Sequence, residues 1–248
     1  MDLGISGRRA AVAAASGGLG FAVADALAQE GVHVAICGHD HERIEAAAAK
    51  IGYDAIPLVC DLSTADGAEA FVDQSAEALG QIDILVANGP GPPPGDFSST
   101  PLEAYAPALE LNLLATVAMC YRGVPAMRER GWGRLVAITS IAVRQPIPQL
   151  ILSNTARTGL TGFLKTLARE VVADGVTVNS LQPGGHATDR MGQVYGHSAA
   201  DLQAAVAAHQ LGRAEDFGRL AAVVCSEHAR FLTGAAIPVD GGAYAGLQ

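Results

Sequence analysis

Seven short apolar runs, separated by segments with helical periodicity, constrain the fold of this chain more than any other feature. Several of these runs are apolar throughout, which is typical of strands buried on both faces of a sheet. Strands that alternate with helices form a parallel sheet with helices on both faces. We therefore predict an α/β fold in one domain, residues 1–248, built on a doubly wound, seven-stranded parallel sheet. The predicted strands are residues 9–14, 32–37, 55–60, 82–87, 134–139, 176–181 and 236–239, and the predicted helices include residues 65–79 and a long region at 102–130.

The composition limits the partners of the chain. With 248 residues, of which 50% are hydrophobic, it can bury one large core. Its net charge of −9 and its pI near 5.1 argue against nucleic acid or an anionic membrane as a partner. No apolar run approaches the roughly 20 residues that span a bilayer, and no cleavable signal is recognisable, so we expect a cytoplasmic protein.

The cysteines give no sign of a metal site. Cys37, Cys60, Cys120 and Cys225 are scattered through apolar segments without metal-ligand spacing. We interpret them as buried thiols of a protein in a reducing compartment, and we expect no bound metal.

A glycine-rich turn follows the first predicted strand. Residues 13–20 read A-A-A-S-G-G-L-G: the first two end the strand, and residues 15–20 form the turn that leads directly into an alanine-rich helix. A second strand follows at the distance expected for a βαβ unit. In this setting the free amides at the start of a helix bind the pyrophosphate of a nucleotide.

The most promising chemistry lies after the fifth predicted strand. Ser140 ends that strand, and thirteen residues later Ser153 lies in the first turn of a helix that also carries Arg157. Positions four apart share a helix face, so Ser153 and Arg157 should point together toward the strand end. Open α/β sheets hold their ligands at such an edge. The plainer alternative is a helix cap, formed by Ser153 or Asn154, beside a solvated Arg157.

Further motifs carry a family resemblance. They are the glycine-rich turn, Asp61 after the third strand, Asn88-Gly89 after the fourth, Asn112 in the long helical region, Pro183-Gly184 with Thr188, and the sequence V-D-G-G at residues 239–242. Together they resemble the short-chain dehydrogenase/reductase family, in particular members known as 3-oxoacyl-carrier-protein reductases. The resemblance implies a Rossmann fold that binds a nicotinamide nucleotide.

The resemblance also assigns expected roles to individual residues. The residues expected to contact the nucleotide are Ala14, Ser16, Gly18, Leu19, Gly20, His39, Asp61, Leu62, Asn88, Gly89, Pro183, Gly184, His186 and Thr188. The expected catalytic residues are Ser140, Ser153, Arg157 and Asn112.

Two of the catalytic positions depart from the family pattern of serine, tyrosine and lysine. Ser153 stands at the tyrosine position and Arg157 at the lysine position. The pKa of an aliphatic hydroxyl lies several units above the value of about 10 for a phenol, and arginine is permanently charged. Acid–base assistance, which contributes about 10²–10⁴-fold, should therefore be badly impaired for an ordinary ketone.

The nucleotide site departs from the pattern too. Ala14 occupies the first glycine position, which strains the turn if φ must be positive. After the second strand, Gly38 replaces the acidic residue of NAD-dependent relatives, and His39 stands where NADP-dependent relatives often have arginine. We therefore predict that NADP(H) is favoured over NAD(H).

Residues 185–210 should form a lid over the substrate, by analogy with the family. Either His186, His197 or Tyr195 could supply the proton that Ser153 cannot, and we place Tyr195 near the substrate. The alternative is a solvated lid that is polar like any loop. Arg144 could bind a carboxylate or a phosphopantetheine group of the substrate, or could be an ordinary surface charge.

Three classes of function remain open. The first is an oxidoreductase with an altered proton-transfer site, acting on an activated or conjugated carbonyl. The second is a non-redox isomerase, dehydratase or cyclase on the same scaffold. The third is a catalytically silent nucleotide-binding protein.

We also predict a homotetramer, with a dimer as the alternative. The two long predicted helices, residues 102–130 and 153–172, carry apolar or small residues on more than one face, and in similar proteins they build a dimer interface. These residues are Ala115, Ala118, Gly123, Leu160, Phe163 and Ala168.

Overall fold

The computed structural model describes residues 1–188 and 207–247, and its core is one seven-stranded parallel sheet. The strands are β1 (Arg9–Val12), β2 (His33–Gly38), β3 (Ile56–Val59), β4 (Ile84–Ala87), β5 (Gly133–Ile138), β6 (Val176–Pro183) and β7 (Ala236–Val239). Their order in the sheet is β3-β2-β1-β4-β5-β6-β7. The strand order reverses between β1 and β4, which is the point where such sheets bind ligands. The predicted fold class is confirmed.

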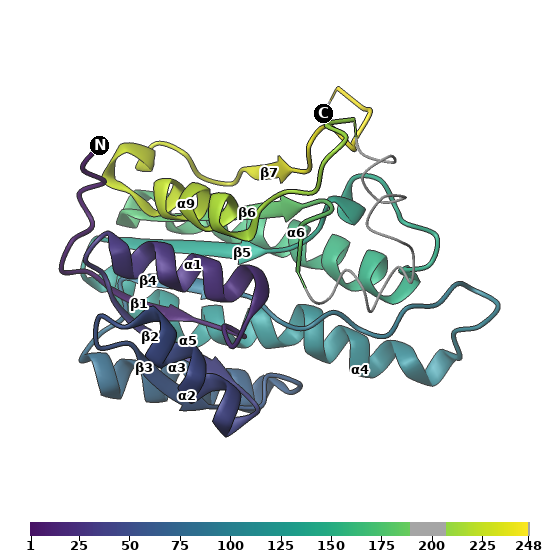
Figure 1. Cartoon of the computed structure of the whole chain (residues 1–248). Helices are drawn as coiled ribbons and strands as arrows, with labels where there is room; N and C mark the ends of the chain where they lie inside the picture. The colour runs from purple at the N-terminus through teal and green to yellow at the C-terminus, as the bar shows by residue number, and fades with distance from the viewer. Residues whose placement is uncertain (189–206, 248) are drawn as a thin grey trace.

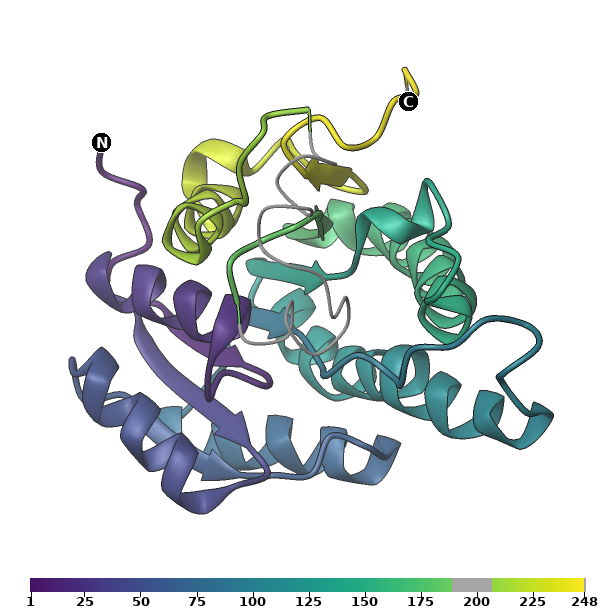
Figure 2. The same ribbon diagram turned by 45° about the vertical axis from the view of Figure 1, so that its right-hand side comes forward.

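Two layers of helices cover the sheet (Figures 1 and 2). One layer is α1 (Gly18–Gln29), α2 (His41–Ile51) and α9 (Ala214–Cys225), and the other is α3 (Ala65–Leu79), α5 (Ala115–Glu129) and α6 (Ile151–Val171). Successive residues of β1 alternate between the two cores: Ala10 and Val12 pack toward α1, whereas Ala11 packs toward α3. None of the helices in the described part of the chain is long and apolar enough to cross a membrane.

The helical region predicted at residues 102–130 is not one α-helix. It consists of a 3₁₀ turn (Leu102–Ala104), α4 (Tyr105–Leu109), a π-helical turn (Glu110–Leu114) and α5. The Glu110 carboxylate accepts a hydrogen bond of 2.8 Å from the Ala65 amide at the start of α3, which holds the π turn against its neighbour. Single π turns within helices are frequent at functional sites, and this one carries Asn112.

The small residues of the long helices pack inside the chain. Ala115, Ala118, Leu160 and Ala168 are all buried, and a Cβ on Gly123 would lie 3.2 Å from a methyl group of Leu85. These positions therefore do not provide the surplus apolar surface on which the prediction of an oligomer was based, because they already pack in the core of the monomer. The homotetramer stays a prediction.

Candidate active site

Arg157 connects α6 to the carboxyl end of β5. Its Nη1 donates hydrogen bonds to the carbonyl oxygens of Ile138, at 2.9 Å, and Thr139, at 3.1 Å. The side chain is only 8% exposed, so the alternative of a solvated Arg157 is wrong. The first turns of α6 therefore face the strand end, as the sequence predicted, and they bring a buried positive charge to it.

Ser140 directly follows this strand end in the chain, and Ser153 precedes Arg157 by one turn on α6. Ser140 is half-buried, and its Oγ accepts a hydrogen bond of 3.1 Å from the Ala142 amide at the start of a 3₁₀ turn, Ile141–Val143. Ser153 is 7% exposed, in the first turn of α6. The residue that caps this helix is Leu150, so the alternative that Ser153 is an ordinary cap is wrong.

The start of α6 is fixed by the segments around it. The Asn154 side chain donates to the Ile147 carbonyl at 2.9 Å, and the Gly95 amide donates to the Gln149 carbonyl at 2.8 Å. The Ile151 amide donates back to Gly95 at 3.2 Å. The proline-rich loop after β4 is thereby tied to the helix that carries Ser153, and its rigidity positions that hydroxyl.

Asn112 is a buried polar residue next to α6. Its side chain is 5% exposed, and its Nδ2 has no hydrogen-bond partner among the described residues. The neighbouring Leu113 contacts α6, since a Cβ on Gly159 would lie 3.6 Å from its Cδ2. An unpaired buried donor is costly unless a water or ligand group completes it.

The glycine-rich turn has the strain expected at its first position. Ala14 has a φ of 48°, and its carbonyl accepts a hydrogen bond of 3.2 Å from the Asn88 side chain. A Cβ at Gly20 would lie 2.5 Å from the same carbonyl, so only glycine fits there. The helix α1 begins at Gly18, and the amides of its first turn point out of the helix as an anion site.

The end of β2 has little room for the acidic residue that Gly38 replaces, and it lies near Arg43, a cation that sequence analysis did not include in the nucleotide site. A Cβ at Gly38 would lie 3.3 Å from the Ser16 side chain, so a larger residue would crowd the turn. Arg43 on α2 reaches the turn: its Nη2 lies 3.9 Å from the Cβ position of Gly17. The exposed His39 lies between them in sequence. The position of Arg43 could have been inferred from Asp40, a typical helix cap, because Asp40 caps α2 and so places Arg43 in the first turn of that helix, next to the strand end.

Asp61 follows β3 and is exposed. Its carboxylate accepts a hydrogen bond of 2.9 Å from the Ser63 amide, and this bond lowers the pKa of Asp61, with a smaller contribution from the charge of His39. Leu62 is buried beside it. The carboxylate is thus ionised and near the histidine, at the side of the sheet expected to hold the adenosine.

Pro183-Gly184 and Thr188 bring the end of β6 to the glycine-rich turn. The Gly184 amide donates to the Val239 carbonyl at 3.0 Å, and a Cβ on Gly184 would lie 2.8 Å from Asp240. A methyl group of Thr188 lies 3.8 Å from the Cβ position of Gly18. The segment expected beside the nicotinamide therefore touches the segment expected to bind the pyrophosphate.

Comparison with known proteins decides the family. The family model described as "Enoyl-(Acyl carrier protein) reductase" matches residues 13–244. Human dehydrogenase/reductase SDR family member 4 is 32% identical over 96% of this chain and 88% of its own length. The chain belongs to the short-chain dehydrogenase/reductase family.

Further relatives of the short-chain dehydrogenase/reductase family support this. A 3-oxoacyl-[acyl-carrier-protein] reductase of Haemophilus influenzae is 29% identical over 97% of this chain and 99% of its own. The structure of L-sorbose reductase from Gluconobacter frateurii, complexed with NADPH and L-sorbose, superposes over 100% of both chains with a TM-score of 0.92 at 29% identity. The chain is thus an oxidoreductase of the short-chain dehydrogenase/reductase type, on a scaffold that binds a nicotinamide cofactor.

Two residues that were given roles in this short-chain dehydrogenase/reductase site make contacts within the chain. Arg144 donates to the Gln182 side chain and to the Ala236 carbonyl, both at 2.6 Å, so its guanidinium ties the segment after Ser140 to β6 and β7. Arg144 is therefore not an ordinary surface charge, and its binding of an anionic substrate stays a prediction. Its hydrogen-bond partners, 38 and 92 residues away in sequence, could not be anticipated.

His186 is packed into the core. Its side chain is 5% exposed, and its ring meets the edge of Phe217 with ring centres 5.3 Å apart. Its Nδ1 lies 3.2 Å from the Gly184 carbonyl, and burial lowers the pKa of the imidazole. A neutral ring against Phe217 is not placed to supply a proton, so that suggestion is wrong for His186.

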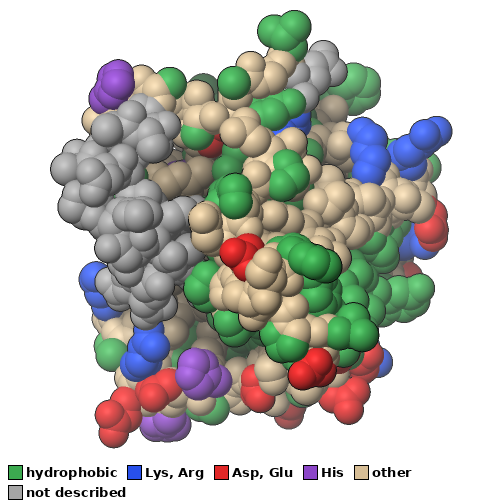
Figure 3. Space-filling view, turned by 90° about the vertical axis from the view of Figure 1, so that its right-hand side faces the viewer, with side chains coloured by type: hydrophobic (Ala, Val, Ile, Leu, Met, Phe, Trp, Pro, Cys, Tyr) green, Lys and Arg blue, Asp and Glu red, His purple; other side chains and the backbone are tan. Residues whose placement is uncertain are grey.

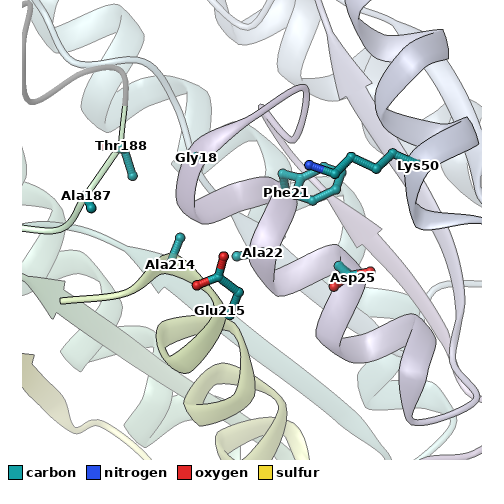
Figure 4. Close-up of a pocket in the computed structure, with 9 residues that line it drawn as sticks. All are labelled: Gly18, Phe21, Ala22, Asp25, Lys50, Ala187, Thr188, Ala214 and Glu215. Carbon is teal, nitrogen blue, oxygen red and sulfur yellow. The ribbon is translucent and has the colours of Figure 1, made fainter.

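A cavity of about 200 Å³ lies beside the glycine-rich turn (Figure 4). Gly18 and Thr188 line it together with the carboxylates of Asp25 and Glu215. Lys50 also lines the cavity, but with one ammonium against two carboxylates its lining is not cationic overall, so we do not assign the pyrophosphate to it.

Only part of the predicted lid, residues 185–210, lies within the described residues. Figure 3 looks onto the carboxyl edge of the sheet, where hydrophobic side chains gather on the surface formed by the described residues. Tyr195, His197 and most of the predicted lid at 185–210 lie outside the described residues. Their proposed roles toward substrate and proton remain predictions.

Proposed function

We propose that the protein uses NADP(H) to reduce a conjugated carbonyl compound, with hydride added to the β-carbon of the double bond. The observation that carries this is the buried guanidinium of Arg157, fixed on the end of β5 by hydrogen bonds to the Ile138 and Thr139 carbonyls, directly before Ser140 in the chain and one helical turn after Ser153. The nucleotide-binding elements surround it, while no phenol stands at position 153. The site therefore has a fixed positive charge and hydroxyl donors in place of a proton-transfer group.

The chemistry of a conjugated substrate fits such a site. When hydride adds to the β-carbon, the negative charge is delocalised onto the carbonyl oxygen as an enolate. Ser140 and Ser153 can donate hydrogen bonds to that oxygen, with the positive charge of Arg157 behind them. The proton is added afterwards at the α-carbon and can come from water. An ordinary ketone gives a more basic alkoxide, which needs its proton as the hydride moves.

The preference for NADP(H) has its own support. Gly38 has no side-chain carboxylate that would repel a 2′-phosphate, and His39 and the guanidinium of Arg43 follow it at the place where the phosphate would lie. Arg43→Ala should weaken NADPH binding at least about tenfold, because a hydrogen bond to a charged group contributes about 1.5–3 kcal/mol. NADH binding should not change. Arg219→Ala, on α9, is the matched control, and calorimetric titration is the measurement.

A substrate panel tests the reaction. NADPH consumption is followed with a conjugated ketone, an enoyl thioester and the saturated ketone of the same carbon skeleton. We expect consumption with the conjugated compounds and little with the saturated ketone. Faster reduction of the saturated ketone would contradict the proposal. Turnover without NADPH consumption would favour the isomerase, dehydratase or cyclase class, and tight NADPH binding without any turnover would favour a silent binding protein.

A further inference from the structure

Two cysteines lie together at the adenosine side of the nucleotide site. Cys37 is the fifth residue of β2 and precedes Gly38, and Cys60 follows the last residue of β3 and precedes Asp61. The parallel register pairs Cys37 with Leu58, two residues before Cys60, so both side chains point to the same face of the sheet. Both belong to the same hydrophobic core, and the Cys60 amide donates to the Gly38 carbonyl at 3.0 Å.

The two thiols differ in acidity, and the Cys60 Sγ donates a hydrogen bond of 3.7 Å to the Gln74 side-chain oxygen. The hydrogen bond from Cys37 lowers the pKa of Cys60, whereas burial raises the pKa of Cys37 well above its usual range. The other two thiols, Cys120 and Cys225, have their pKa values raised to about 12 by burial. Cys60 is also the most exposed of the four, at 6%. Because the thiolate is the reactive form, oxidation should begin at Cys60.

We propose that Cys37 and Cys60 form an oxidant-sensitive dithiol, which hydrogen peroxide converts to a disulfide. The Cys60 thiolate first attacks peroxide: an S–O bond forms, the O–O bond breaks and hydroxide leaves. The Cys37 sulfur, losing its proton, then attacks the Cys60 sulfur, so that an S–S bond forms and water leaves. The two sulfurs lose two electrons and the peroxide is reduced to water.

The disulfide changes the loop that carries Asp61. An S–S bond is only about 2.05 Å long, whereas Cys60 lies two residues along the chain from Leu58, the register partner of Cys37, so the sulfurs must approach. Cys37 is held inside the sheet, because β2 pairs with β1 on one side and β3 on the other, and its carbonyl accepts from the Ala15 amide at 2.8 Å. Cys60 lies past the end of an edge strand, so the movement falls on Cys60 and Asp61.

The expected consequence is weaker nucleotide binding, and this part of the inference depends on the proposed binding of NADP(H). Asp61 and His39 flank the adenosine side of the site, and the disulfide links the loops that carry them. We expect the Kd for NADPH to rise at least about tenfold on oxidation and to recover on reduction with dithiothreitol.

The experiment uses the full chain, reduced and then freed of reductant. Hydrogen peroxide is added, free thiols are counted in denaturant, and non-reduced peptides are mapped by mass spectrometry. We expect two thiols to disappear and a peptide linking Cys37 to Cys60 to form. NADPH affinity is measured before oxidation, after it and after re-reduction.

Variants separate the possible outcomes, each compared with itself before and after peroxide. Cys60→Ser and Cys37→Ala should show no linked peptide and no loss of affinity on oxidation, whereas Cys120→Ala should behave like the wild type. Four thiols that stay reduced in the folded protein would overturn the proposal. So would a linked peptide with unchanged NADPH affinity, or an equal loss of affinity in Cys60→Ser. Absence of NADPH binding to the reduced wild type would instead overturn the proposed function.

Discussion

Two buried arginines lie at opposite ends of β5, and they are arranged differently. At the amino end, Arg134 is 2% exposed, stacks on Trp132 at 4.2 Å and lies 3.6 Å from the Glu227 carboxylate. At the carboxyl end, Arg157 is 8% exposed and bonds to the carbonyls of Ile138 and Thr139. One strand thus separates a guanidinium enclosed by an aromatic ring and a carboxylate from one whose hydrogen bonds go to the backbone carbonyls of the strand end.

The amino end is built for stability. Trp132 lies between Arg8, at 3.8 Å, and Arg134, and its Nε1 donates to the Glu227 carboxylate at 2.6 Å. Burial lowers the pKa of Arg134, while the charge of Glu227 opposes that shift. A buried charge enclosed in this way has its hydrogen bonds and its counter-charge within the protein.

We propose that the carboxyl end binds a ligand. Ser140 follows this strand end and Ser153 lies one turn before Arg157 on α6, while the Asn112 amide lacks a partner among the described residues. Such a group costs stability until something binds to it. The comparison suggests different uses for two buried arginines: Arg134 stabilises the fold at one edge of the sheet, and Arg157 is proposed to contribute to a ligand site at the other.

The largest expected effect is on the amino end. Arg134→Met should lower the free energy of unfolding by about 3 kcal/mol, because the buried guanidinium loses its hydrogen bonds to the carbonyls of Gly133, Gly175 and Ser226, together with its ion pair to the 38% exposed Glu227. The NADPH affinity of the folded protein should not change. Urea denaturation with a nucleotide titration measures both. A loss below about 1 kcal/mol would mean that the closed arrangement contributes little.

Ser140→Ala should act in the opposite way at the carboxyl end. Loss of one donor to a developing oxyanion lowers turnover by about 10²-fold. The free energy of unfolding should fall by only about 1 kcal/mol, since one hydrogen bond to the Ala142 amide is lost. Ser75→Ala on α3 also removes a buried hydroxyl and is the matched control, with unchanged turnover expected. Equal turnover in both variants would show that Ser140 does not contribute to the reaction.

Ala14→Gly tests the strain at the carboxyl edge. Because Ala14 has a φ of 48°, glycine should relieve the backbone and raise the free energy of unfolding by about 0.5 kcal/mol, after its greater freedom in the unfolded chain is subtracted. Ala13→Gly, one residue earlier and fully buried, should be destabilising instead. Thermal unfolding of the two variants shows whether their effects have opposite signs.

The smallest expected effect is on the pH dependence of the free energy of unfolding. Burial lowers the pKa of His186 in the folded protein, so below about pH 6.5 the unfolded chain binds a proton that the folded chain does not. Stability is then lost as the pH falls below that value. His186→Gln should flatten part of this dependence, whereas the exposed His33→Gln should not. The same pH dependence in the His186 variant as in the wild type would assign it to other groups.

Local patterns in the sequence predicted most of the fold. The bounds of α3 and β7 were predicted as the structure has them, because the apolar periodicity and the cap at Thr64 are local signals. The π turn was not predicted, since it depends on a hydrogen bond between Glu110 and the distant Ala65. A helical pattern cannot show such a contact.

The candidate site could be predicted only in part. Motif positions placed Ser140, Ser153 and Arg157 at one strand end, because strand and helix geometry fix where they point. The contacts of Arg144 and His186 could not be predicted, because their side chains bond or pack to residues distant in sequence. A polar residue near a site in sequence can serve the core in space.

The most direct test of the central proposal is the double variant Ser153→Tyr/Arg157→Lys. Turnover of the conjugated substrate and of the matched saturated ketone is measured beside the wild type. The variant restores the family's tyrosine and lysine but replaces the fork that bonds to Ile138 and Thr139, and it adds bulk where Ser153 is 7% exposed. We expect conjugated-substrate turnover to fall about 10²-fold, without gain of ketone reduction. Gain of saturated-ketone reduction with conjugated-substrate turnover intact would contradict the proposal.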